Sequence, residues 1–259
     1  MTWTEGDVTL DGVRIHYYRR GSGRPLVLAH GFSDNGKCWE RVATVLEDRY
    51  DIVAYDARFH GKSDAPADAA FGDAADLVGL VEALGLEKPA AMGHSMGAGT
   101  VAAAVGHRPD LFRCAILEDP PWRDEWPTAA RPEPPKWNEM PLAEAIAYGK
   151  KQSPHWNDAE FPAWAESKQQ LRVPPDWASR RPGFLGNWRE RAAAIGVPTL
   201  LIRGNNAERG AIVTGAVARE ATQLNPRIEC VCLAAAGHNI RREAFPEFVA
   251  AVTAFLGRS

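Results

Sequence analysis

The chain has 259 residues, of which 45% are hydrophobic, and a formal net charge of −3 at pH 7. A chain of this length and apolar content can bury one large core, and many α/β domains of this size are single units. The acidic balance, with a pI near 6.2, argues against nucleic acid or an anionic membrane as a partner, because both require a basic face.

Short apolar runs of the strand type recur along the chain. In order, they are Val13–Tyr18, Leu26–Ala29, Ile52–Tyr55, Ala90–Gly93, Cys114–Glu118, Thr199–Arg203 and Ile228–Leu233. Helical patterns lie between most of them. These are Trp39–Glu47, Ala69–Leu84, Met96–His107, Thr214–Leu224 and Phe245–Leu256. A turn at Asp11-Gly12 suits an antiparallel hairpin at the edge of a sheet. The β-α-β alternation that follows predicts a mostly parallel sheet covered on both faces.

The composition changes abruptly after Asp119. The stretch 120–188 holds 12 of the 19 prolines and 7 of the 9 tryptophans. It predicts short helices at Leu142–Lys151 and Phe161–Leu171, without a convincing strand. We therefore expect a core of residues 1–119 and 190–259, and a helical cap of residues 120–189 over the sheet edge where ligands bind. Most of the indoles should form the cap's own core, while Trp122, directly after the sixth strand, is expected to face the substrate pocket.

Residues 93–97 read Gly-His-Ser-Met-Gly between an apolar run and a helical run. This is the G-x-S-x-G pattern in the strand–turn–helix context that a nucleophile elbow requires. The turn is so tight that Ser95 should adopt a strained backbone, and a side chain at either glycine would collide with the backbone. A glycine-rich structural turn is the alternative. We expect Ser95 to be a nucleophile.

A serine needs a base to take its proton. His238 is the best candidate, because it lies in a loop after the last strand and before the final helix. The oxyanion formed during attack needs backbone N–H donors. The amide of Met96 is one candidate, and the amide of Phe32, after the strand Leu26–Ala29, is the other. Gly31 allows a close backbone approach at the pocket, and its neighbour His30 is expected to brace this loop rather than act as an acid or base.

Four features of the sequence, taken in chain order, resemble those of the α/β-hydrolase superfamily, and together they extend along the whole chain. They are the His-Gly-Phe segment at 30–32, the elbow at 93–97, the cap and the Gly-His pair at 237–238. The resemblance implies an α/β-hydrolase fold, with a mostly parallel eight-stranded sheet flanked by helices and a helical cap inserted after strand 6. It also implies no metal and no organic cofactor. One segment, 56–63, resembles the usual D-x-R-G-H-G-x-S, but Phe59 stands where relatives have glycine.

The acid that should orient His238 has three candidates. In most relatives it follows the seventh strand, where this chain offers only Glu208. In haloalkane dehalogenases and in the fungal zearalenone lactonase, whose layout is similar, the acid follows the sixth strand, 24 positions after the nucleophile. Counting from Ser95 gives Asp119. Strand alternation allows only one of Glu118 and Asp119 to face the histidine. We favour Asp119 and keep Glu208 and Glu118 as alternatives.

A serine nucleophile sets aside the dehalogenases and epoxide hydrolases of this fold, which carry aspartate there. The resulting hypothesis is a serine carboxylesterase or lactonase that acts on a hydrophobic small molecule. Hydrolysis of a carbon–carbon bond, perhydrolase activity and a non-catalytic small-molecule receptor are the alternatives. The start of the chain has no secretory signal pattern, and no apolar run reaches the roughly 18 residues of a membrane span. With four cysteines expected to be free thiols, we expect a cytoplasmic protein.

Overall fold

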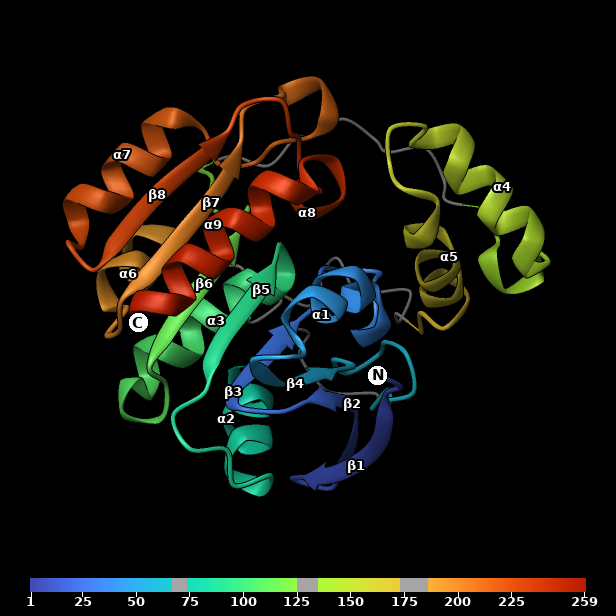
Figure 1. The fold of residues 1–259 in the computed structure, drawn as a ribbon, viewed down its shortest axis with the longest axis horizontal. Helices are drawn as coiled ribbons and strands as arrows, with labels where there is room; N and C mark the ends of the chain where they lie inside the picture. The colour runs from blue at the N-terminus through green and yellow to red at the C-terminus, as the bar shows by residue number, and fades with distance from the viewer. Residues whose placement is uncertain (67–73, 125–134, 173–185) are drawn as a thin grey trace.

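An eight-stranded sheet forms the centre of the protein (Figure 1). The computed structural model describes residues 1–66, 74–124, 135–172 and 186–259. The strands are β1 (Thr4–Leu10), β2 (Val13–Gly21), β3 (Arg24–Ala29), β4 (Tyr50–Tyr55), β5 (Ala90–His94), β6 (Cys114–Glu118), β7 (Thr199–Gly204) and β8 (Ile228–Leu233). Their spatial order is β1-β2-β4-β3-β5-β6-β7-β8. β2 pairs antiparallel with β1 and β4, and all other neighbours pair in parallel. The predicted fold class is confirmed.

The antiparallel edge begins with the hairpin predicted from Asp11-Gly12. Both residues have positive φ, 49° and 79°, as the tight turns that match strand twist require. Leu10 pairs with Val13 directly across this turn. The hairpin therefore adds β1 as an edge strand and leaves the parallel strands β3 to β8 in the interior and at the opposite edge.

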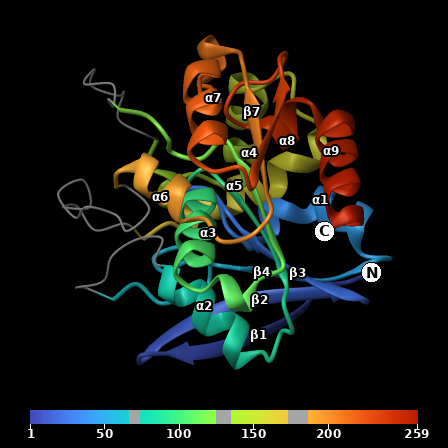
Figure 2. The same cartoon turned by 90° about the vertical axis from the view of Figure 1, so that its left-hand side faces the viewer.

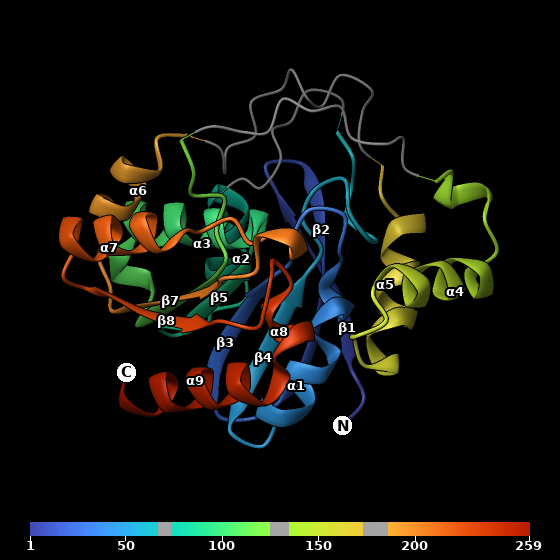
Figure 3. The same cartoon turned by 90° about the horizontal axis from the view of Figure 1, so that it is seen from above.

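Helices cover both faces of the sheet. They are α1 (Glu40–Leu46), α2 (Ala74–Ala83), α3 (Met96–His107), α4 (Leu142–Gln152), α5 (Phe161–Gln169), α6 (Trp188–Ala194), α7 (Gly215–Leu224), α8 (Ile240–Glu243) and α9 (Phe245–Arg258). Short 3₁₀ turns are η1 (Gly36–Trp39), η2 (Pro109–Leu111), η3 (Trp137–Glu139), η4 (Asp158–Glu160) and η5 (Ala207–Arg209). α2, α3 and α7 lie on one side of the strands and α9 on the other (Figures 2 and 3). In the predicted helix Ala69–Leu84, residues 69–73 lie outside the described residues.

Two hydrophobic clusters fill the space between the sheet and these helices. β3 shows how one strand serves both: Val27 and Ala29 belong to the cluster under α2 and α3, whereas Leu26 and Leu28 belong to the cluster under α1 and α9. Successive side chains of a strand point to opposite faces, so a strand buried on both faces is apolar throughout. All four side chains are buried.

The interval expected to be a cap contributes α4 and α5, which lie beside one another and away from α6 and α7 (Figures 1 and 3). α5 packs against α4 and against η1, the turn that follows β3. Residues 125–134 and 173–185 of this interval lie outside the described residues. The boundary at 189 falls inside α6, which packs on α3 and α7. Within the described ranges, every helix is too short or too polar to cross a bilayer.

Candidate active site

Ser95 lies in a strained turn between β5 and α3. Its φ of 51° and ψ of −113° are in a region that a residue with a side chain rarely adopts. A Cβ on Gly93 would lie 2.3 Å from the carbonyl oxygen of Gly97, and a Cβ on Gly97 would lie 2.2 Å from that of Ala29. Both glycines are therefore required by backbone contacts, as the pattern at 93–97 predicted.

The side chains of Asp119 and His238 meet at the carboxyl edge of the sheet. Oδ2 of Asp119 lies 2.7 Å from Nδ1 of His238. A carboxylate accepts, so Nδ1 carries the proton and Nε2 is left with a lone pair. Asp119 is fully buried, while the imidazole of His238 is 24% exposed. The arrangement has the geometry of a carboxylate–imidazole pair that can receive a proton at Nε2.

Two backbone amides hold the carboxylate of Asp119 in place. Ile212 N–H donates to Oδ2 at 2.9 Å, and Val213 N–H donates to Oδ1 at 3.0 Å. Both amides belong to the segment after β7, the place where most relatives are expected to carry the acid. Here that segment supplies donors to an acid that follows β6. Sequence analysis did not anticipate these amides, because a backbone donor leaves no residue-type signal.

The other two acid candidates lie elsewhere. Glu118 is buried and accepts from the backbone N–H of Arg241 at 2.8 Å and from its guanidinium at 3.1 Å. Its strand neighbours Cys114 and Ile116 face the cluster under α1 and α9, so alternation directs Glu118 to that face. Glu208 lies in η5 and is exposed. The described contacts thus bring only Asp119 of the three candidates to His238.

His94 connects the elbow to the loop that carries His238. Its Nε2–H donates to the carbonyl oxygen of His238 at 3.0 Å, and the two rings lie 4.7 Å apart. Burial, together with Arg241, holds the pKa of His94 well below its usual value, so the ring is neutral. A Cβ on Gly31 would lie 2.5 Å from Nδ1 of His94. Gly31 is therefore needed for the close approach of the loop after β3.

We call the loop after β3, residues 30–35, the β3 loop, and the loop after β8, residues 234–239, the β8 loop. His30 is 1% exposed; its Nδ1–H donates to Gly31 O at 2.8 Å and its Nε2 accepts from Ala57 N–H at 3.0 Å. Its ring atoms are thus used to brace the loop. Phe32 is half-buried, with its ring 5.8 Å from that of His60. Met96 is the first residue of α3, where a backbone N–H has no partner within the helix.

Trp122, expected at the pocket wall, is 1% exposed and belongs to the hydrophobic cluster under α2 and α3. Its ring stacks on that of Trp188 at 6.0 Å. The indole of Trp188 in turn donates to Asp124 at 3.0 Å. These are core contacts, because Trp188 begins α6, which packs on α3 and α7. Trp122 therefore packs in this core cluster, against Trp188 of α6.

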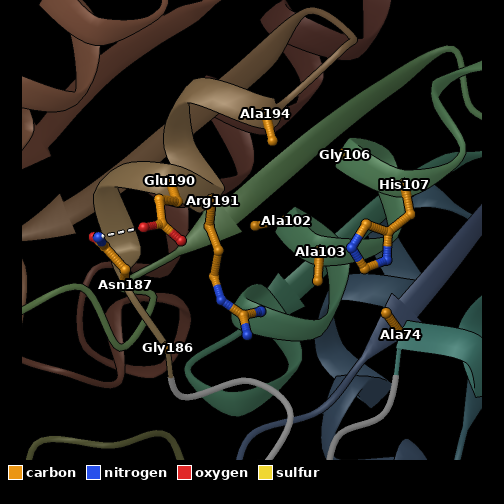
Figure 4. A pocket seen from close by; sticks show the side chains of 10 residues that line it. All are labelled: Ala74, Ala102, Ala103, Gly106, His107, Gly186, Asn187, Glu190, Arg191 and Ala194. Carbon is orange, nitrogen blue, oxygen red and sulfur yellow. Dashed lines mark hydrogen bonds between the residues drawn. The ribbon is translucent and has the colours of Figure 1, made fainter.

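A cavity of about 490 Å³ opens between α2, α3 and α6 (Figure 4). Its lining includes Ala74, Arg191 of α6, and four residues of α3, which are Ala102, Ala103, Gly106 and His107. The lining residues do not include Ser95, Asp119 or His238, and the α3 residues begin seven positions after Ser95. Within the described part of the chain, the lining of this cavity thus holds no member of the candidate active site. Among the described residues, no group of three His, Cys, Asp or Glu side chains is arranged to hold a metal ion.

Residues 24–183 match the model of the α/β hydrolase fold family, and the chain belongs to that family. It is 33% identical over 117 residues to an epoxide hydrolase of Caballeronia sordidicola, covering 43% of this chain and 36% of that protein. It is 37% identical over 121 residues to N-formylmaleamate deformylase of Pseudomonas putida, covering 45% of each chain. The chain thus matches less than half the length of these curated relatives.

Among solved structures, the fold is similar to that of E-2-(acetamidomethylene)succinate hydrolase. The TM-score is 0.78 at 21% identity, over 99% of this chain and 100% of the other. At this identity the likeness concerns the fold. The likeness in fold covers 99% of this chain and so includes the segments after residue 183.

Proposed function

We propose that the protein is a serine hydrolase that cleaves a carboxylic ester or lactone of a hydrophobic small molecule. One observation carries the proposal: a buried carboxylate, fixed by two backbone amides, lies 2.7 Å from the imidazole of His238. The same edge of the sheet presents Ser95 in a strained elbow. His94, next to Ser95, contacts the backbone of His238, and the N–H of Ser95 donates to Glu118 O at 2.9 Å, next to Asp119.

The chemistry follows from these positions. Nε2 of His238 takes the proton of the Ser95 hydroxyl as Oγ attacks the carbonyl carbon. The amides of Met96 and Phe32 donate to the oxyanion, and the positive end of α3 stabilises it further. His238 then protonates the leaving alcohol, and water activated by His238 releases the acid from the acyl-enzyme. Asp119 keeps the proton of the imidazole on Nδ1 throughout.

The substrate class rests on the aromatic composition of the interval 120–189. In its described part, Trp164 contacts both Trp137 and Trp156, at ring distances of 5.5 and 6.5 Å. This cluster gives α4 and α5 an apolar core of their own. Ligand sites in such settings are mostly apolar, with a few polar groups that fix orientation. Hydrophobic esters and lactones fit this environment better than highly charged molecules.

Hydrolysis of an amide is a second candidate. A deformylase and an acetamidomethylene-succinate hydrolase are, by name, relatives or structural neighbours of this chain, and an acyl-enzyme on Ser95 serves either leaving group. The epoxide hydrolase relative gives weaker support to epoxide opening, because this chain has serine at the elbow where that chemistry is expected to use aspartate.

The first test is Ser95→Ala. It should remain folded and lose several orders of magnitude in kcat towards a p-nitrophenyl ester, because only oxyanion stabilisation and binding remain. His238→Ala should lose nearly as much, and the double variant little more, since the two residues act as a unit. A fluorophosphonate should label Ser95 in the parent protein, as read by peptide mass spectrometry.

Parallel assays of a lactone, a formamide, a β-diketone and peracid formation separate the alternatives. Turnover of the formamide alone would favour the amide candidate, and turnover of the β-diketone or peracid alone would favour those activities. Ligand binding without turnover of any substrate would indicate a receptor. A label on another serine, or an active Ser95→Ala, would show that the elbow is not the reactive site.

A further inference from the structure

Five buried charged side chains form a cluster beside the candidate active site. They are Asp34, Glu118, Lys168, Arg241 and Arg242, and each is at most 9% exposed. Oδ2 of Asp34 accepts from Arg241 at 3.0 Å and from Arg242 at 2.9 Å, and its Oδ1 accepts from Lys168 at 3.1 Å. Arg241 also binds Glu118 through its backbone and its guanidinium. We call this set the Asp34 cluster.

Four of the five members lie on segments that carry the candidate catalytic groups, and the fifth, Lys168, belongs to α5. Asp34 belongs to the β3 loop, which presents Phe32. Glu118 is the residue before Asp119. Arg241 and Arg242 lie in α8, the helix that follows His238. One carboxylate, that of Asp34, therefore joins the loop proposed to bind the oxyanion to the segment proposed to carry the base.

The β3 loop has a shape that needs such support. It closes with a hydrogen bond from Asp34 N–H to Gly31 O at 3.0 Å. Ser33, between them, has a φ of 66°, which is unfavourable for a residue with a side chain. Lys168 of α5 donates to both the carbonyl oxygen and the hydroxyl of Ser33, at 2.7 and 3.0 Å. The loop is thus held from its end, by Asp34, and from its middle, by Lys168.

The charges in the cluster keep Asp34 ionised. Burial alone would raise the pKa of Asp34, but Arg242, Lys168 and Arg241 outweigh burial and hold it well below its usual value. An ionised carboxylate accepts from all three cations at once, and such charge-assisted bonds are shorter and stronger than neutral ones. A neutral amide at this position would present N–H donors to at least one of the same cations.

We propose that Asp34 is a positioning residue, whose carboxylate fixes the β3 loop relative to α8 and the β8 loop, so that the oxyanion donors and His238 converge on one carbonyl group. The inference rests on the proposed hydrolase function and extends it to a residue that touches neither Ser95 nor His238. The effect of Asp34 is on the rate of the chemical step, kcat. The geometry that it maintains matters most in the transition state, where the oxyanion and the imidazolium form together.

The test compares Asp34→Asn with Glu160→Gln. Glu160 is a matched control: its carboxylate is also buried and binds Arg242, at 3.3 Å, and Arg41, at 3.0 Å, but it lies in η4, outside the β3 loop. Asp34→Asn should lower kcat by about 10- to 100-fold, the scale of a misplacement of about 1 Å, with KM nearly unchanged. Its affinity for a boronic acid, a tetrahedral transition-state analogue, should fall by a similar factor. Glu160→Gln should keep kcat and boronate affinity within about threefold.

Two outcomes would contradict the inference. If Asp34→Asn keeps the parent kcat, or if Glu160→Gln loses as much, the cluster serves stability alone and the inference is wrong.

If Asp34→Asn does not fold, Arg242→Lys takes its place in the test. Lysine keeps the positive charge but lacks the forked guanidinium that reaches Asp34, Glu160 and Asn239. That variant should lose about tenfold in kcat, and an unchanged kcat would overturn the inference. A parent protein without turnover or Ser95 labelling would instead refute the proposed function.

Discussion

Asp119 illustrates how one residue is fixed by contacts from three directions. Its carboxylate accepts from Ile212, Val213 and His238, while its own N–H donates to Ile202 O at 2.9 Å. Its φ is 42°, a conformation that Asp tolerates better than most residues with a side chain. An ionised carboxylate can accept all three bonds, whereas an amide has an acceptor at only one of its two ends.

Asp119→Asn should therefore lower kcat by up to about 10⁴, because the amide removes the charge that steadies the imidazolium and no longer fixes the proton on Nδ1. It should also lower the free energy of unfolding by about 1–3 kcal/mol, since an amide NH₂ must face either a backbone N–H or His238. Steady-state kinetics below the unfolding transition, with urea unfolding of the same sample, separates the two effects.

Glu208→Gln is the control for this variant, because Glu208 is exposed in the segment where relatives are expected to carry the acid. Its kcat should stay within a few-fold of the parent. The reverse pattern, with Glu208→Gln inactive and Asp119→Asn active, would restore the commoner arrangement of the superfamily and contradict the role proposed for Asp119.

At the scale of elements, the β5–elbow–α3 unit is set by close backbone contacts. The Cβ that Gly97 lacks would lie 2.2 Å from Ala29 O and 2.6 Å from His30 O, so the start of α3 rests directly on the end of β3. This contact places the amide of Met96 beside the β3 loop. The elbow thus depends on the distance between two elements as much as on its own turn.

Gly97→Ala should lower the free energy of unfolding by several kcal/mol, because the collision is with backbone that cannot move without separating α3 from β3. The matched control is Gly257→Ala in α9, where a Cβ meets nothing within 4 Å. It should be neutral or stabilising by up to about 1 kcal/mol, the helix propensity gain of alanine over glycine. Urea midpoints of both variants measure this. Equal effects would show that the close contact at Gly97 is not a constraint.

Seven of the eight strands and the elbow could be predicted because their causes are local, whereas the ranges of β1, α6 and α8 were not anticipated. Short apolar runs predicted the bounds of β6 and β8, and a serine between two glycines, after a strand and before a helix, is typical of a nucleophile elbow. The Asp34 cluster could not be predicted, because its members are separated by up to 208 positions and each, taken alone, is an ordinary charged residue. The core position of Trp122 was missed for a related reason: its stacking partner, Trp188, lies at the far end of the interval 120–189 along the chain.

At the scale of the whole molecule, three buried histidines link stability to pH. His30, His60 and His94 are each at most 3% exposed and lie around the β3 loop. Burial lowers the pKa of His30, and it lowers that of His94 well below the usual value. Burial, with His30 nearby, lowers the pKa of His60 to about 3. All three rings are therefore neutral in the folded protein near pH 7.

Unfolding exposes these rings and returns each pKa to about 6.5. Below that pH the unfolded chain binds more protons than the folded one, so the free energy of unfolding decreases as the pH falls. The contribution of His60 is fully present above about pH 6.5 and is lost progressively down to its folded-state pKa of about 3. His60 contributes up to about 1.4 kcal/mol per pH unit between these limits, and the lowered pKa values of His30 and His94 act in the same direction. Urea unfolding at pH 7, 6 and 5 should show this slope, reduced by about one proton in His60→Gln and unchanged in His107→Gln, an exposed histidine. A free energy of unfolding that stays constant from pH 7 to pH 5 would mean that the rings are protonated in the folded state. It would contradict the conclusion that the β3 loop packs against neutral imidazoles.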